Sequence, residues 1–100
     1  MLVKHLRDDY RRPFATLVVI KCRKEIKLGI SICHSKLDTF NKKIGTDLAR
    51  ARACAGAKVQ LPNMWIIYGG RYMDIEDIID CEIDLMYDRS RRYYKQAVDN

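Results

Sequence analysis

A chain of 100 residues, 48% apolar and 32% charged, has the composition of one folded domain rather than of a disordered segment. Its longest uninterrupted apolar run covers residues 64–68, far short of the roughly 20 residues that a membrane-spanning helix needs. Residues 1–12 carry cations but no apolar stretch, so we expect no secretory signal there. We therefore expect a single cytoplasmic domain over residues 1–100 that has no membrane partner.

The formal net charge of +6 is concentrated in the first part of the chain. Residues 1–72 hold 15 Lys and Arg against five Asp and Glu, whereas residues 73–100 hold four against eight. A basic body of this size attracts polyanions, and nucleic acid is the first of them to consider. Two further interpretations stay open. The cations only keep the surface solvated, or they pair with the acidic C-terminal part within or between subunits.

The four cysteines are Cys22, Cys33, Cys54 and Cys81, and no two of them have the C-x-x-C spacing. Zinc sites usually take their ligands from such short spacings, because a tight turn then presents two thiolates to one ion. Nothing points to a secretory compartment, where disulfides form. We expect four buried, reduced thiols, no metal site and no cofactor.

Taken in chain order, residues 1–10 are expected to form a short helix that ends before a proline, since the residue before proline avoids the helical region. Residues 14–22 are rich in β-branched side chains, and every second residue of 26–33 is apolar. Both segments are therefore predicted strands of one hairpin. A three-residue loop in this hairpin would place Val18 opposite Ile30.

A helix is predicted from about Lys36 to Ala55. Ser35 is a suitable N-cap and Gly56 a suitable stop, and apolar residues recur between them at a spacing of three to four. This apolar stripe is expected to pack on the sheet, and it consists of Leu37, Phe40, Ile44, Leu48, Ala51 and Ala55.

A third strand is predicted near residues 64–68, followed by a break at Gly69 and Gly70. A second long helix follows over about residues 74–97. Asp74 can cap it, and its acids fall in the first half, where the helix dipole favours them.

These elements predict an α+β fold with one antiparallel sheet of about three strands. The sheet is expected to contain the hairpin 14–33 and the strand near 64–68. Both helices, at about 36–55 and 74–97, are expected to pack on one face of it.

The predicted helix at 36–55 carries the clearest functional pattern. Lys36, Lys43 and Arg50 are seven residues apart and therefore lie on one line along its side. Long cations on such a line suit the phosphate oxygens of a nucleic-acid backbone. No aromatic pair is apparent on a strand to stack bases, so any binding is expected to read the backbone. The alternative is an ordinary solvated helix face. The predicted contacts are Lys36, Lys42, Lys43, Arg50, Arg52 and Lys58.

The predicted helix at 74–97 carries an acidic face and, near its end, tyrosines and arginines. The acids either keep the helix soluble or dock on a basic surface of a second copy or of another protein. Tyrosine and arginine are common interface anchors, but they are as common at the edge of a small core. Glu82 lies among apolar positions, where a carboxylate needs an arginine or a tyrosine hydroxyl as partner unless it lies near the edge. The predicted interface residues are Asp77, Asp80, Asp84, Tyr87, Asp88, Arg91 and Tyr94.

The triplet Glu25-Ile26-Lys27 matches the E-x-K pattern that metal-dependent nucleases carry on a hairpin, where carboxylates hold Mg²⁺. Three residues often match by chance, and the preceding predicted strand lacks the Asp that such a site also needs. A nuclease is therefore a minor alternative, and we expect no enzyme.

Residues 29–53, GISICHSKLDTFNKKIGTDLARARA, resemble a pattern of small uncharacterised bacteriophage proteins. In that pattern a strand ending G-x-S-x-C precedes F-x-K-x-x-G-x-x-[IL]-A-x-x-R-A. The resemblance implies a phage accessory protein that acts in the host cytoplasm, and it implies nothing about catalysis. The matching residues are Gly29, Ser31, Cys33, Asp38, Phe40, Lys42, Gly45, Leu48, Ala49, Arg52 and Ala53.

We therefore expect a non-enzymatic phage-type accessory protein that binds nucleic-acid backbone through a basic helix face. The alternative is a protein–protein interaction module that modulates a host or phage factor, with a homo-oligomer as one form. The two hypotheses use different helices, the basic one at 36–55 and the acidic one at 74–97.

Overall fold

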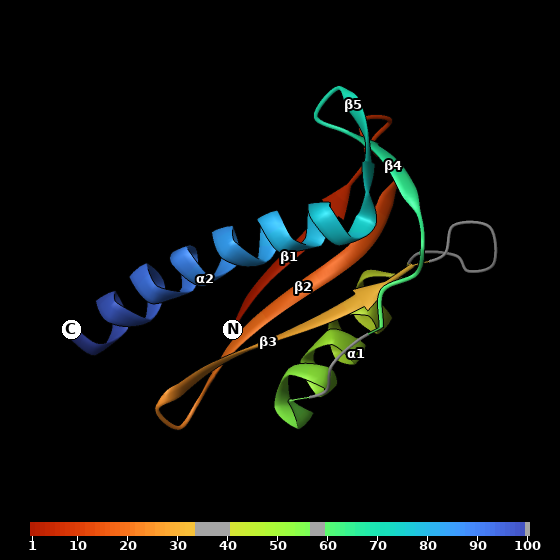
Figure 1. The fold of residues 1–100 in the computed structure, drawn as a ribbon. Helices are drawn as coiled ribbons and strands as arrows, with labels where there is room; N and C mark the ends of the chain where they lie inside the picture. Colours follow the sequence, from red (N-terminus) through yellow and green to blue (C-terminus); the bar gives the residue numbers. More distant parts are fainter. Residues whose placement is uncertain (34–40, 57–59, 100) are drawn as a thin grey trace.

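The computed structural model describes residues 1–33, 41–56 and 60–99, and these form an α+β fold, as predicted (Figure 1). Three antiparallel strands make the main sheet in the order β1-β2-β3, and two more strands pair in a separate small sheet. Neither described helix carries an apolar stretch long enough to cross a bilayer. The elements are β1 (Leu2–Arg7), β2 (Pro13–Cys22), β3 (Glu25–Ile32), α1 (Lys42–Ala55), β4 (Trp65–Tyr68), β5 (Arg71–Asp74) and α2 (Ile75–Asp99).

The N-terminal segment is a strand, so the helix predicted there is wrong. β1 pairs antiparallel with β2, from Leu2 opposite Val19 to Leu6 opposite Ala15. Successive side chains of a strand point to opposite faces, and Leu2 and Leu6 both fall on one of them. This strand completes the three-stranded sheet, whereas the predicted third strand, β4, pairs with β5 instead.

The predicted hairpin is confirmed, but its register differs by one residue from the expected one. Cys22 pairs with Glu25, so the turn has two residues, and the first of them, Arg23, adopts a left-handed φ of 58°. Val18 therefore lies opposite Gly29 rather than Ile30. A shift of one residue turns every side chain of one strand to the other face relative to its partner strand. Each residue of β2 therefore shares a face with other β3 residues than expected.

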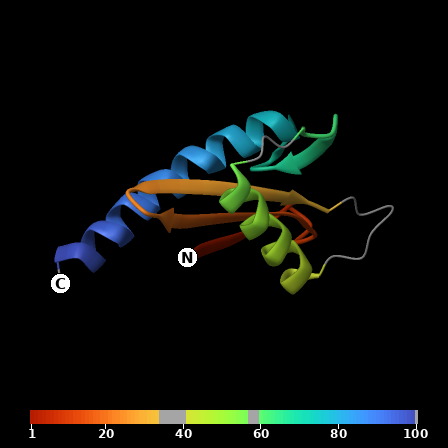
Figure 2. The same cartoon turned by 90° about the horizontal axis from the view of Figure 1, so that it is seen from below.

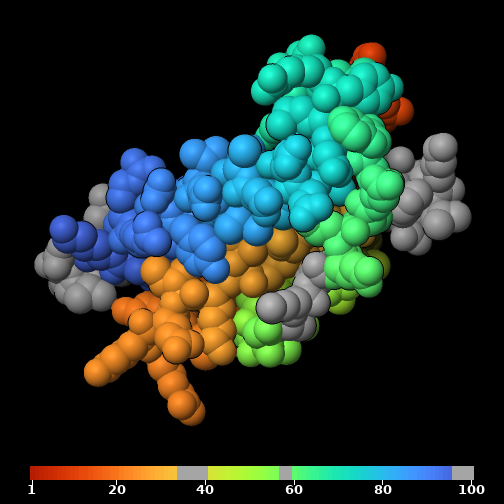
Figure 3. Space-filling model, viewed as in Figure 1, coloured from red at the N-terminus to blue at the C-terminus, as the bar shows by residue number. Residues whose placement is uncertain are grey.

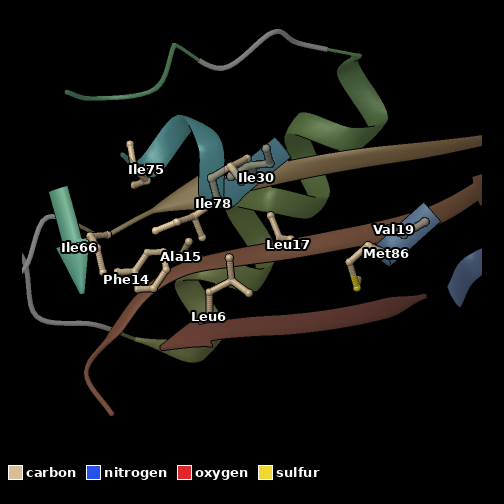
Figure 4. Packing of buried hydrophobic residues seen from close by; sticks show 11 residues of the cluster. Leu6, Phe14, Ala15, Leu17, Val19, Ile30, Ile66, Ile75, Ile78 and Met86 are labelled. Atoms are coloured by element: carbon tan, nitrogen blue, oxygen red, sulfur yellow. The ribbon is translucent and has the colours of Figure 1, made fainter. Parts of the chain in front are cut away.

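The two helices lie on opposite faces of the sheet, and the expectation that they share one face is wrong (Figure 2). The aliphatic face packs against α2. Figure 4 shows Leu17 and Val19 from β2 and Ile30 from β3 meeting Ile78 and Met86 of α2. A helix with large apolar residues fits this face because both surfaces bury a large apolar area.

The other face of the sheet is made of small residues and packs against α1. A Cβ atom built on Gly29 would lie 1.8 Å from the carbonyl oxygen of Ala49, so only glycine allows this approach. On α1 itself, one helical turn before Ala49, Gly45 faces Thr16 and Ser31 of the sheet. The helix backbone thus lies close to the strands because neither surface carries a large side chain between them.

This close packing also decides which side of α1 is buried. Ala49 and Ala53 are fully buried, while Ile44 is 64% exposed and Leu48 is also exposed. The predicted apolar stripe therefore does not pack on the sheet within its described part, because the smaller residues on the neighbouring side do. Leu37 and Phe40 of that stripe lie outside the described residues.

Capping residues set the helix ends. Asn41 is the N-cap of α1, since its side chain accepts a hydrogen bond from the Ile44 N–H, and Gly56 ends the helix with a φ of 64°. The predicted start near Lys36 lies outside the described residues, and the predicted end is confirmed. At α2, the Asp74 carboxylate accepts a bond from the Glu76 N–H, as expected for its cap.

Candidate functional site

Three cations form what we term the cationic face of α1: Lys42, Lys43 and Arg50. All three are exposed. The described residues contain three ion pairs, and none of them involves this face. Of the remaining predicted contacts, Lys36 and Lys58 lie outside the described residues.

The first turn of α1 concentrates positive charge. It contains Lys42 and Lys43 and no acidic residue. The N-terminus of a helix already carries a partial positive charge, so cations there are unfavourable by a few tenths of a kcal/mol each, roughly. A bound anion would relieve this repulsion, and the backbone and both lysines would attract it together.

The charge of this turn acts on a histidine of β1, His5. Partial burial lowers the pKa of His5 from its usual 6.5, and the charges of Lys42 and Arg7 lower it further. The imidazole Nδ1 lies 3.0 Å from the Thr16 hydroxyl oxygen. The lowered pKa of His5 therefore reflects burial first and the positive charges of Lys42 and Arg7 second.

Arg52 has a structural contact within the molecule. Its Nη1 donates to the carbonyl oxygen of Ile30 at 2.8 Å, and the side chain is half-buried. The bond ties the last turns of α1 to the outer edge of β3. We therefore leave Arg52 out of the proposed contact set.

The predicted acidic interface lies on α2, on the other side of the sheet. Asp77, Asp80, Asp84 and Asp88 are all exposed, and Asp88 pairs with Arg91 at 3.3 Å. Figure 3 shows this surface, with α2 lying along it and the turn between β2 and β3 projecting beside its C-terminal half. Since α1 lies behind the sheet in that view, these acids do not neutralise its cations.

Two tyrosines of this interface prediction are partly used by the fold. Tyr87 is half-buried. Tyr94 accepts a hydrogen bond from the Lys21 N–H at 3.0 Å, and its hydroxyl lies 3.5 Å from the Val19 carbonyl oxygen. β1 begins opposite Val19, so the Tyr94 hydroxyl binds β2 where its pairing with β1 ends.

Glu82 is buried, and it has the partner that its position required. Both the Lys4 ammonium and the Tyr68 hydroxyl donate to its carboxylate. Burial acts to raise the pKa of Glu82, but the bonds from Lys4 and Tyr68 outweigh it and the pKa is lowered. Burial and the bond to Glu82 raise the pKa of Tyr68 well above its usual value. This cluster joins β1, β4 and α2.

The nuclease hypothesis gains no support from the described geometry. Glu25 is exposed at the turn between β2 and β3. Among the described residues, no three His, Cys, Asp or Glu side chains lie close enough together to hold a metal ion. None of the four cysteines forms a disulfide, but the expectation that they are buried is wrong, since Cys54 and Cys81 are exposed and Cys22 and Cys33 half-buried.

The sequence analysis missed one surface, which we term the aromatic hollow. It has a volume of about 650 Å³ and lies where the turn after β1 meets the β4–β5 hairpin, side by side in Figure 1. Its wall includes three exposed rings, Tyr10, Trp65 and Tyr72. The Gly69-Gly70 pair is typical of a two-residue hairpin turn, but β5 was not predicted, so Trp65 and Tyr72 were not placed on neighbouring strands.

Comparison of this chain with protein-family models, with curated proteins and with solved structures finds no match.

Proposed function

We propose that the protein binds nucleic-acid backbone through the cationic face of α1, without catalysing a reaction. The observation that carries the proposal is the first turn of α1, where Lys42 and Lys43 lie at the positive end of the helix with no acid in the turn. The phage-type setting and the host cytoplasm that the sequence resemblance implies belong to the same proposal.

The shape of the face suits a chain of phosphates better than a single small anion. Lys43 and Arg50 are two turns apart on the helix, roughly 10 Å along its axis. Arg7 adds an exposed cation at the end of β1, and its charge acts on His5 as that of Lys42 does. Each cation that neutralises a phosphate releases condensed counterions, so binding is expected to weaken steeply with salt.

The test is a titration of labelled duplex and single-stranded DNA at low and moderate salt with a charge-reversed variant. Lys43→Glu with Arg50→Glu removes two contacts, and the slope of log K against log salt is expected to become shallower by about two. Lys24→Glu with Arg92→Glu is the matched control, because it changes the net charge equally at exposed positions off α1. Equal affinities of the two double variants would show that the cationic face is not the binding surface.

A protein-interaction function is the second candidate, and the exposed Leu85 favours it. Leu85 is 56% exposed next to Asp84 and one turn before Asp88, so an apolar anchor has acids beside it. Such a face suits a cationic partner, including the α1 of a second copy. Sedimentation at low and high salt tests the second copy: a dimer that Asp80→Lys with Asp84→Lys abolishes would support it, and a monomer throughout would contradict it.

A further inference from the structure

The rings of the aromatic hollow are exposed because of the way the β4–β5 hairpin is paired. Ile67 lies opposite Tyr72, and Trp65 is two residues before Ile67, so the three side chains share one face of the hairpin. On the opposite face, Ile66 is buried and packs into the core beside Phe14 (Figure 4). Trp65 and Tyr72, 63% and 67% exposed, are therefore held at the surface by a hairpin anchored from behind.

The third ring comes from a turn that is fixed to the same hairpin. The Asp9 carboxylate accepts bonds from the Gly69 N–H at 3.0 Å and the Gly70 N–H at 2.8 Å, and the Asp9 N–H donates to the Ile67 carbonyl oxygen. Asp8 in turn accepts a bond from the Tyr10 N–H. The backbone segments that carry the rings are thus held together before any ligand arrives, which lowers the entropy that binding must overcome.

One arginine and one aspartate line the hollow, Arg12 and Asp8. The Arg12 guanidinium lies 5.2 Å from the centre of the Tyr10 ring, and Arg11 is exposed in the same turn. The nearby acids are engaged in the fold: Asp8 pairs with Arg12, Asp9 accepts bonds from backbone N–H groups, and Asp74, opposite Trp65, accepts a bond from the Glu76 N–H. Exposed rings with an arginine beside them are a combination that binds bases by stacking and phosphates by charge.

Arg7 contacts the turn that carries one of these rings. Its Nη1 donates to the carbonyl oxygen of Arg11, next to Tyr10, and its charge, like that of Lys42, lowers the pKa of His5.

We propose that the aromatic hollow binds the unpaired bases of a single-stranded nucleic acid, which stack on Tyr10, Trp65 and Tyr72. The inference rests on the proposed function and adds a substrate class to it. In a duplex the bases are already stacked and paired, so only the backbone is available to this surface. Every base offers a flat face to such rings, so the preference is for single strands rather than for a sequence.

Trp65 is the only tryptophan of the chain, and it reports directly on the hollow. The experiment follows its fluorescence while single-stranded oligothymidylate of about 12 nucleotides, the length class of one single-strand site, or the matching duplex is added. We expect saturable quenching by the single strand at concentrations where the duplex causes little.

A variant with the reporter intact gives the second readout. Tyr72→Ala removes one exposed ring and is expected to weaken single-strand binding about 5- to 100-fold, with duplex binding unchanged. Tyr93→Ala is the matched control, because this tyrosine is also exposed, at 46%, but lies on α2 away from the hollow. Circular dichroism confirms that both variants are folded.

The outcomes separate the two proposals. If the single strand and the duplex bound equally and neither changed the fluorescence of Trp65, base stacking in the aromatic hollow would be overturned. Backbone binding by α1 would remain supported. The single strand could also quench Trp65 in a way that Tyr72→Ala weakens and that Lys43→Glu with Arg50→Glu leaves unchanged. That result would support base stacking in the aromatic hollow and overturn backbone binding by α1. Quenching by a peptide but by no nucleic acid would assign the hollow to a protein partner and overturn both.

Discussion

The carboxylate of Glu82 stabilises this fold only while it is charged and bonded to Lys4 and Tyr68. Glu82→Gln keeps the size of the side chain but removes the charge, and we expect a loss of about 1–3 kcal/mol in the free energy of unfolding at pH 7. Urea denaturation measures it, and Asp84→Asn on the exposed face of α2 is the control, expected to change stability by less than about 0.5 kcal/mol.

The pH dependence of this effect follows from the lowered pKa of Glu82. Below the usual value of 4.5 the unfolded chain takes up a proton before the folded one does, so the stabilisation is lost as the pH falls through the folded-state pKa. The difference between wild type and Glu82→Gln should therefore shrink on acidification. A difference that stays constant from pH 7 to acid would contradict the role of its charge.

His5 gives a second pH-dependent contribution. Its pKa is lowered by burial and by Lys42 and Arg7, so below pH 6.5 the unfolded chain binds a proton more readily, and the fold loses stability as the pH falls. In His5→Gln, the free energy of unfolding should depend less on pH in the range below 6.5. An NMR titration of the imidazole measures the pKa directly. When DNA is added, a phosphate bound near Lys42 should raise the pKa of His5. A pKa of His5 above 6.5 in the free protein would contradict the proposed effect of burial and of the two cations.

Among the elements, the packing of α1 depends on Gly29 more than on any large side chain. Gly29→Ala puts a Cβ 1.8 Å from the Ala49 oxygen and 2.5 Å from the Ala53 nitrogen, both backbone atoms that cannot rotate away. We expect the free energy of unfolding to fall by about 3 kcal/mol or more.

Gly45→Ala is the matched comparison on the helix side. Its Cβ would lie 3.0 Å from the Thr16 hydroxyl, a side-chain atom, and alanine favours a helix over glycine by about 1 kcal/mol. The two variants are compared by urea denaturation. If Gly45→Ala destabilised the protein as much as Gly29→Ala, the close approach at Gly29 would not be the controlling contact.

The same elements explain how far the sequence could predict the fold. Local signals identified the hairpin, both helices and the end of α1 at Gly56, because caps and periodicity act within a few residues. β1 was missed because LVKHLR fits a helix face as well as a strand, and only pairing with β2 decides between them. The buried side of α1 was missed because Ala49 and Ala53 are less apolar than Ile44 and Leu48, and the small face of the sheet selected them.

For the candidate sites, the sequence located charges but not their surroundings. The exposure of Lys43 and Arg50 and of the aspartates on α2 agrees with the predicted helix faces. The aromatic hollow joins turns some 60 residues apart, held by Asp9 at Gly69 and Gly70, and no local pattern connects them. The bond of Arg52 to Ile30 likewise depends on how α1 crosses β3.

Over the whole molecule, the sheet separates the cations that begin α1 from the acids in the first half of α2. α1 lies on one side of the sheet, and α2 lies on the other (Figure 2). A polyanion is attracted to the first set of charges and repelled by the second, so charge favours one orientation of it on the protein. The proposed function depends most on this polarity, because the backbone-binding face of α1 requires it.

The most direct test is the mapping of backbone amide chemical shifts in the ¹H–¹⁵N NMR spectrum while DNA is added. The account predicts that amides of Lys42, Lys43 and Arg50 shift with added DNA, and that those of Asp77, Asp80 and Asp84 stay in place. Shifts confined to α2, or none at all at low salt, would contradict it.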